Sequence, residues 1–209
     1  MRLWKKLEIV ENPPVYIGAD DECYYARDYI ARGSYKDSEA NQLISNFKRH
    51  PKFRASPAWR YKLAAIDRFA RELAAAVTKN VAIAGIPSSK LADHPEYDSR
   101  LVDVLQTLAG LRPDLTVESP FGCKESTVAA HLGGSRSVDE INANLVWRGL
   151  SPGCRVLILV DDVLTSGAHF KACKRLVATH APGVRVAGVF WARTVWPEPA
   201  NPFEDVSLL

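Results

Sequence analysis

One short segment, residues 156–170, constrains the fold of this chain more than any other. It opens with five apolar residues, VLILV, at positions 156–160. A short apolar run rich in β-branched residues is typical of a fully buried strand, most often in a parallel sheet. Two acids and a turn of small residues follow, and the turn leads into a helix-like stretch over 169–179. The segment therefore predicts a buried strand, a tight loop and a helix in direct succession.

The loop of this segment has residues suited to a phosphosugar. Asp161 and Asp162 come directly after the apolar run, and TSGA at 165–168 precedes the helix. A helix N-terminus offers unpaired N–H groups and the positive end of its dipole to a phosphate, and small residues let the phosphate approach the backbone. Carboxylates accept hydrogen bonds from sugar hydroxyls. This order of residues predicts a phosphosugar site; the alternative is an ordinary strand–turn–helix whose acids cap the helix.

Length and composition narrow the class of protein. A chain of 209 residues can form one sizeable α/β core with appendages, or one domain with a small second one. A net charge of +3 is too small to indicate nucleic acid or a membrane, and no apolar run approaches the ~20 residues that span a bilayer. The four cysteines form no CxxC pair, which argues against a zinc ribbon or a redox motif. We expect reduced thiols in a cytoplasmic protein.

Further elements follow from hydrophobic periodicity. The predicted core strands span 81–86, 115–118 and 184–191, and a last short strand is predicted at 205–208. The predicted helices span 58–79 and 98–110, the second with Gly110 as its C-cap. This alternation of helices and strands predicts an α/β fold with a doubly wound, mostly parallel sheet.

The N-terminal part has weaker secondary-structure patterns, and the helix at 58–79 has no candidate functional residue. In the N-terminal part, a short strand is predicted at 15–17 and a helix at 39–49, capped by Asp37 or Ser38. In the helix at 58–79, most charges, Lys62 included, lie outside the apolar stripe. We interpret that helix as a packing element without a chemical role.

The central segment also resembles a known family. Residues 157–168 are similar to the phosphoribosyl-pyrophosphate (PRPP) signature of the type I phosphoribosyltransferases: four apolar residues, two acids, two apolar residues and a small Thr/Ser/Gly loop. The family has Ser or Thr at the next position, where this chain has His169. The resemblance implies a Rossmann-like, doubly wound core over 58–209 with a C-terminal tail, and a small N-terminal hood over 1–57 that selects the acceptor.

The resemblance implies an enzyme. It would be a phosphoribosyltransferase that binds PRPP and Mg²⁺, transfers phosphoribose to a nucleobase-like acceptor and releases pyrophosphate. Asp161 and Asp162 would act as catalytic residues that hold the ribose hydroxyls, directly or through the hydration shell of the metal. The remaining PRPP-binding residues of this segment would be Val163, Leu164, Thr165, Ser166, Gly167, Ala168 and His169. Relatives that act on 6-oxopurines carry an acid at the position of Thr165, so this residue argues against hypoxanthine or guanine.

The resemblance assigns pyrophosphate binding to the loop after the first core strand. That loop contains Ser88, Ser89 and Lys90, whose hydroxyl, N–H and ammonium groups suit phosphate oxygens. The family often has a cis peptide at this place, so one is expected near Ser88–Ser89. Without the resemblance, the residues are those of an ordinary surface loop with an incidental lysine.

A lid is expected over 119–144. In the resembled family a long loop here closes over the site, and such lids exclude water and bring in cations. Lys124 and Arg136 are the candidate catalytic cations; the alternative is that both are solvated surface charges. The run KESTVAAHLGGSRSVDEINANL is similar to the corresponding region of ComF-type competence-associated proteins, although their zinc ribbon is missing here.

The acceptor base has candidate contacts near the end of the last core strand. Trp191 and Arg193, followed by Trp196, are predicted at the sheet edge where open α/β proteins bind ligands. These side chains would flank a flat nucleobase, make an oligomer contact or cover a hydrophobic patch. A homodimer is therefore one of the options.

A second function comes from another class of protein. Some proteins of this fold bind PRPP or nucleotides only to regulate. Such a regulator would carry an appended DNA- or RNA-binding element, and the sequence has no helix-turn-helix pattern and no basic arm. This argues against nucleic acid as a partner and favours the enzyme, whose partners are PRPP and a nucleobase-like small molecule.

Overall fold

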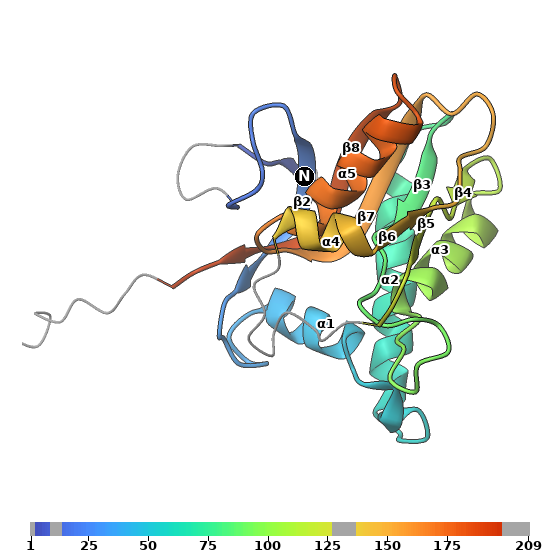
Figure 1. Cartoon of the computed structure of the whole chain (residues 1–209). Coiled ribbons are helices and arrows are strands. Elements are labelled where there is room, and N and C mark those ends of the chain that lie inside the picture. The colour runs from blue at the N-terminus through green and yellow to red at the C-terminus, as the bar shows by residue number, and fades with distance from the viewer. Residues whose placement is uncertain (1–2, 9–13, 127–136, 198–209) are drawn as a thin grey trace, which may run out of the picture.

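The computed structural model describes residues 3–8, 14–126 and 137–197. They form a central sheet covered by helices on both faces (Figure 1). The helices are α1 (Glu39–Phe47), α2 (Trp59–Ala76), α3 (Arg100–Leu111), α4 (Val138–Asn144) and α5 (Ala168–His180), with a 3₁₀ turn η1 (Pro51–Phe53). The strands are β1 (Lys5–Lys6), β2 (Glu22–Ile30), β3 (Ala82–Gly85), β4 (Thr116–Glu118), β5 (Phe121–Cys123), β6 (Leu145–Trp147), β7 (Val156–Leu164) and β8 (Arg185–Val195).

The main sheet is mostly parallel. Within the described residues it has six strands in the order β1-β2-β8-β7-β3-β4, and every neighbouring pair is parallel except β1 and β2. β5 and β6 form a separate antiparallel pair. The predicted α/β architecture with a mostly parallel sheet is confirmed, and the apolar run at 156–160 begins β7, a central strand of that sheet.

Two apolar clusters lie on the two faces of the sheet. α1, α2 and α3 pack on one face around Phe47, Phe69 and Leu108. α4 and α5 cover the other face around Val138 and Phe170 (Figure 1). Each helix turns an apolar stripe toward the sheet, so the packing that fixes β7 comes from both sides.

Local signals set the helix starts. The side chain of Ser38 accepts a hydrogen bond from the backbone N–H of Asn41 at 2.9 Å and caps α1, as one of the two predicted caps. Ser137 and Glu140 form a capping box at the start of α4. This helix and β5 lie within 119–144, the region predicted to be one long loop, and β6 follows directly after it. Both elements are too short for their apolar periodicity to be recognised in the sequence.

Two predicted boundaries are wrong. Gly110 lies inside α3, whose C-cap is Arg112. Because the N–H of Arg112 donates to the carbonyl of Leu108 at 2.8 Å, the last turn closes without a left-handed glycine. β8 runs four residues beyond Trp191, to Val195, because it pairs with β7 as far as Arg193 and with β2 as far as Val195.

Where a small hood over 1–57 was predicted, the described residues include β1 and β2, which are strands of the main sheet. β2 pairs in parallel with β8 along its length. Its sequence, ECYYARDYI, did not indicate a strand because charges interrupt the aromatic residues. In the structure these charges have partners: Arg27 pairs with Glu72 of α2, and Asp28 accepts from Arg193 of β8 at 2.7 Å. The strand predicted at 15–17 is absent from this described stretch, which forms a turn.

β3 and β7 lie at a reversal in the strand order. The chain runs from β3 outward to β4 and then returns to the other side of β3 as β7. Open α/β sheets bind ligands at such reversals, beyond the carboxyl ends of the strands. β3 ends at Gly85, opposite Val160, so β7 extends beyond it from Asp161 onward. The predicted acids therefore lie where this class of fold binds ligands.

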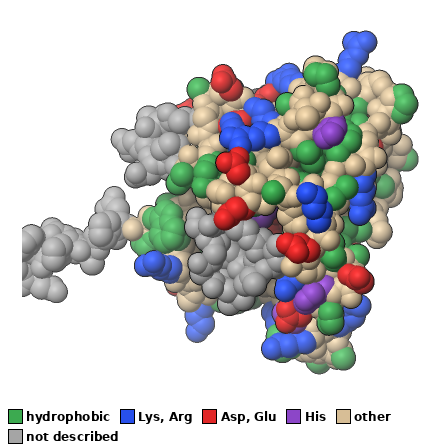
Figure 2. All heavy atoms as spheres, in the orientation of Figure 1, with side chains coloured by type: hydrophobic (Ala, Val, Ile, Leu, Met, Phe, Trp, Pro, Cys, Tyr) green, Lys and Arg blue, Asp and Glu red, His purple; other side chains and the backbone are tan. Residues whose placement is uncertain are grey.

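The surface agrees with the small net charge. On the face shown in Figure 2, acidic and basic side chains are interspersed. Among the described residues, no helix combines the length and the apolar character needed to cross a membrane. The strand predicted at 205–208 lies outside the described residues.

Candidate functional site

The loop between β7 and α5 has a backbone that requires glycine. Gly167 is the N-cap of α5 and has φ 82°, in the left-handed region. A Cβ at this position would lie 2.4 Å from Cδ1 of Ile17, so any side chain would clash. The carbonyl of the neighbouring Ser166 accepts from the N–H of Tyr16 at 2.9 Å. The turn at 15–17 thus supports the loop from behind.

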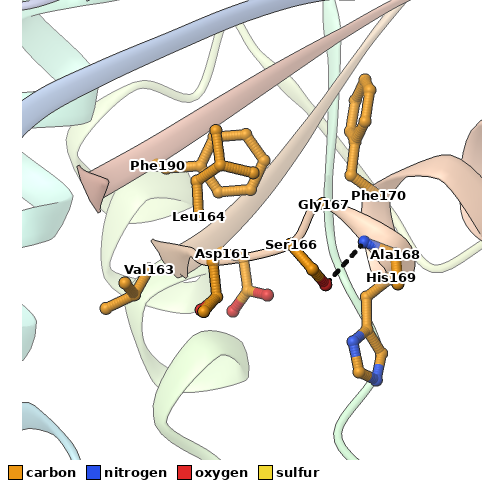
Figure 3. Close-up of a pocket in the computed structure, with 10 residues that line it drawn as sticks. Asp161, Val163, Leu164, Ser166, Gly167, Ala168, His169, Phe170 and Phe190 are labelled. Carbon is orange, nitrogen blue, oxygen red and sulfur yellow. Dashed lines mark hydrogen bonds between the residues drawn. The ribbon is translucent and has the colours of Figure 1, made fainter. Parts of the chain in front are cut away.

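This loop encloses a small open pocket at the start of α5. Its lining consists of Asp161, residues 163–170 and Phe190. In Figure 3, Asp161, Ser166 and His169 point to one side of the loop. The hydroxyl of Ser166 accepts from the N–H of Ala168 at 3.4 Å, which leaves the mouth of the helix lined with polar groups. The structure brings every predicted loop residue from 163 to 169 together here with the first acid.

The second acid does not face this pocket. Successive residues of a strand point to opposite faces of the sheet, so Asp161 and Asp162 diverge. Asp162 is 4% exposed and lies against the helices of the α1–α3 face. Nε of Arg100 donates to its Oδ2 at 3.0 Å, and Nζ of Lys48 lies 3.0 Å from its Oδ1. The prediction that both acids hold one ribose therefore does not match their placement.

The two acids also differ in charge state. Burial, with the nearby charge of Asp162, raises the pKa of Asp161 to about 7. Burial would also raise the pKa of Asp162, but the charges of Lys48 and Arg100 outweigh it and lower that pKa below its ordinary value. Near neutral pH the site thus contains an ionised, paired acid beside one that gains or loses a proton readily.

Lys48 and Arg100 were missed from the sequence. Arg100 begins α3, where a cation is disfavoured by the helix dipole. That conflict is a usable signal, because a cation at a helix start needs a specific acidic partner. Lys48 has no such signal, since it ends α1 where cations are ordinary. The interpretation of Lys62 as one of the outward charges of a packing helix is also wrong. Its side chain is buried, and its Nζ donates to Asp98 at 2.8 Å.

The predicted pyrophosphate loop follows the carboxyl end of β3. The hydroxyl of Ser88 accepts from the N–H of Lys90 at 3.3 Å, and Nζ of Lys90 lies 3.7 Å from Glu96. Ser88, Ser89 and Lys90 are therefore next to the β3–β7 reversal, although they do not line the small pocket. The described residues contain no cis peptide bond, so the one expected near Ser88–Ser89 is wrong.

Of the two predicted lid cations, the structure describes Lys124, which does not line the pocket. Nζ of Lys124 donates to the carbonyl of Ala143 at 2.5 Å, which ties the end of β5 to α4. Arg136 lies outside the described residues. The catalytic role of both stays a prediction.

The two predicted base contacts, Trp191 and Arg193, have different surroundings in the structure. Trp191 is 0% exposed and stacks on Phe69 with ring centroids 4.4 Å apart, so it offers no face to a nucleobase. Trp191 lies in the core because β8 continues past this residue and directs its ring toward α2. Arg193 donates to Asp28 and lies 4.5 Å from the ring of Tyr25, on the side of β2.

Magnesium remains compatible with the donor set. Among the described residues, no group of three or more His, Cys, Asp or Glu side chains could hold a metal. Mg²⁺ usually keeps several waters and uses one or two carboxylates together with substrate phosphates, so a caged site is not required. Asp161 is the carboxylate that faces the pocket, whereas Asp162 is held by its two cations.

Comparison with known proteins gives no family. No protein-family model matches this chain, and no curated protein matches it.

Proposed function

We propose that this protein is a PRPP-dependent phosphoribosyltransferase that uses Mg²⁺ and passes phosphoribose to a nucleobase-like acceptor. The observation that carries the proposal is the joint placement of Asp161 and the loop at 165–168 in one pocket. The loop ends at the N-terminus of α5, which favours an anion, and the acid lies within reach of a sugar attached to that anion. This pocket lies at the reversal of strand order where open α/β sheets bind ligands.

Each residue has a distinct task in this proposal. Backbone N–H groups of the loop, with Ser166, bind the 5′-phosphate, and the ionised Asp161 accepts hydrogen bonds from the ribose hydroxyls. Ser88 and Lys90 bind the pyrophosphate, and Mg²⁺, when bound, offsets part of its charge. Substitution at C1 gives the ribose ring positive charge in the transition state. The protein therefore acts by positioning and electrostatics, without a covalent intermediate on the chain.

A regulator that binds PRPP without turnover is the second candidate. The observation that favours it is the burial of Trp191, which removes the predicted platform for an acceptor base. A binding protein needs no acceptor, and the phosphosugar pocket would serve it equally well.

Turnover distinguishes the two candidates. The protein is incubated with PRPP, Mg²⁺ and a panel of nucleobases, and pyrophosphate release is measured. The enzyme releases pyrophosphate with at least one base, and Asp161→Asn abolishes the release while Asp114→Asn, an exposed acid paired with Arg112, does not. Binding of PRPP without release by any base would favour the regulator, and no binding of PRPP would contradict both.

A further inference from the structure

A lysine of α2, Lys62, is buried against the end of α1. The side chain of Lys62 is 1% exposed. Its ammonium donates to the carbonyl of Phe47 at 2.8 Å and to that of Arg49 at 3.0 Å, and lies 2.8 Å from Asp98. These three acceptors match the three donors of an ammonium group. Burial lowers the pKa of Lys62, and the hydrogen bond and charge of Asp98 oppose that shift.

The first two acceptors form an arm that reaches the second acid. Phe47 and Arg49 flank Lys48 at the end of α1. Nζ of Lys48 extends to Oδ1 of Asp162 at 3.0 Å. By bonding the carbonyls on either side, Lys62 fixes the backbone from which Lys48 extends.

The third acceptor forms another arm to the same acid. Asp98 accepts from Nη1 of Arg100 at 2.9 Å, while Nε of that guanidinium donates to Asp162 at 3.0 Å. The N–H of Asp162 in turn donates to Oδ1 of Asp161 at 2.7 Å. An unbroken series of polar contacts therefore joins the buried lysine to the carboxylate that faces the pocket.

We propose that Lys62 is a positioning residue of the candidate site. Through Lys48 and Arg100 it holds Asp162 in place. Asp162, so held, directs the carboxylate of Asp161 toward the ligand. The inference rests on the proposed function, since the ligand is taken to be PRPP. A role in stability alone explains the arrangement poorly, because a buried ion pair is often no more stable than an apolar replacement.

Ligand affinity tests this role with a matched control. Lys62→Met keeps an unbranched side chain only one atom shorter and removes the ammonium group. Arg112→Gln is the control, because Arg112 donates to the carbonyls of Ala74 at 2.7 Å and Val77 at 3.0 Å at the end of α2, as Lys62 does at the end of α1. Calorimetry with PRPP and Mg²⁺ should show an affinity about tenfold lower or more for Lys62→Met, as for loss of one charged hydrogen bond, and an unchanged affinity for the control.

Equal affinity of wild type and Lys62→Met would overturn the inference, as would an equal loss in the control. If Lys62→Met does not fold, Asp98→Asn is measured instead. This variant breaks the contacts that run from Lys62 through Asp98 to Arg100, and it keeps the lysine. The same loss of affinity is then expected.

A second measurement needs no ligand. In a double-mutant cycle, Lys62→Met and Asp162→Asn are combined, and the unfolding equilibrium constants are compared. Hydrogen bonds and ion pairs join these side chains through Lys48 and through Asp98 with Arg100, so a coupling of more than about twofold supports the proposed positioning role. Additive effects overturn it. If the wild type binds no PRPP, the proposed function fails and this cycle alone decides on the inference.

Discussion

At the scale of single residues, the two adjacent acids of the site have different environments. Asp161 lines the pocket beside the loop, and Asp162 is enclosed by two cations on the other face of the sheet. Adjacent positions on a strand make this divergence unavoidable. We therefore assign ligand binding to Asp161 and anchoring to Asp162.

Replacing each acid separately should separate these roles. Asp161→Asn should weaken PRPP binding by a factor of ten or more, at about 1.5–3 kcal/mol for a charged hydrogen bond, and leave the fold intact. Asp162→Asn should lower the free energy of unfolding by about 1–3 kcal/mol, because it leaves Arg100 and Lys48 without their acid. Calorimetry and urea denaturation measure the two effects. Equal effects of the two variants on both quantities would contradict the assignment.

The raised pKa of Asp161 predicts a pH dependence of stability. Its value of about 7 in the folded protein lies above the ordinary 3.8, so the folded state binds more protons than the unfolded state between these values. The free energy of unfolding should then fall as pH rises from about 4 to about 7, by up to about 1.4 kcal/mol per pH unit. The ionisation of Asp162 makes the free energy of unfolding rise with pH, but only below about pH 4, because its pKa is lowered.

Urea denaturation of wild type and Asp161→Asn across about pH 4.5–7.5 tests this dependence. The variant cannot ionise at position 161, so its curve should lack the decline that the wild type shows. Parallel curves would mean that Asp161 is ionised throughout this range.

At the scale of elements, the loop between β7 and α5 depends on one glycine. Gly167→Ala forces an alanine into the left-handed region, at about 1–2 kcal/mol, and drives a methyl group into Ile17. Gly153→Ala is the matched control, because Gly153 also has φ 82° but no atom within 4 Å of the added Cβ. We expect both variants to lose stability in urea denaturation and only Gly167→Ala to lose PRPP affinity as well. Retained affinity would show that the loop tolerates the shift.

Elements differ in how far the sequence predicts them, and the reasons are physical. β7 and its loop follow from local chemistry, since a buried run, acids and small residues occupy 15 consecutive positions, 156–170. β2 does not, because Arg27 and Asp28 resemble loop charges until α2 and β8 supply partners. The contact of Arg100 with Asp162 joins residues 62 positions apart, and no periodicity encodes it.

At the scale of the whole molecule, the described residues of the N-terminal region complete the core. α1 contributes Phe47 and Ile44 to the cluster on the α1–α3 face, and β2 covers the outer edge of β8. We therefore expect the boundary predicted at residue 57 to divide one folded unit.

A fragment of residues 58–209 tests this organisation. Without β2 and α1 it exposes the edge of β8 and the aromatic side chains that pack on Phe47, so we expect it to lack cooperative thermal unfolding. Circular dichroism of the fragment beside the full chain measures this. A cooperative transition of the fragment by itself would show that residues 58–209 fold without the N-terminal region, as the predicted boundary implies.

The pairing of β2 with β8 has a consequence for synthesis. Glu22 of β2 is paired with Ala187 of β8, 165 positions further along the chain. At ribosomal rates of about 5–20 residues per second, β2 waits on the order of ten to thirty seconds for the strand that completes its pairing. During that time the backbone edge of β2 that later pairs with β8 is unpaired, so we expect nascent chains to associate through it unless dilution or a chaperone prevents that.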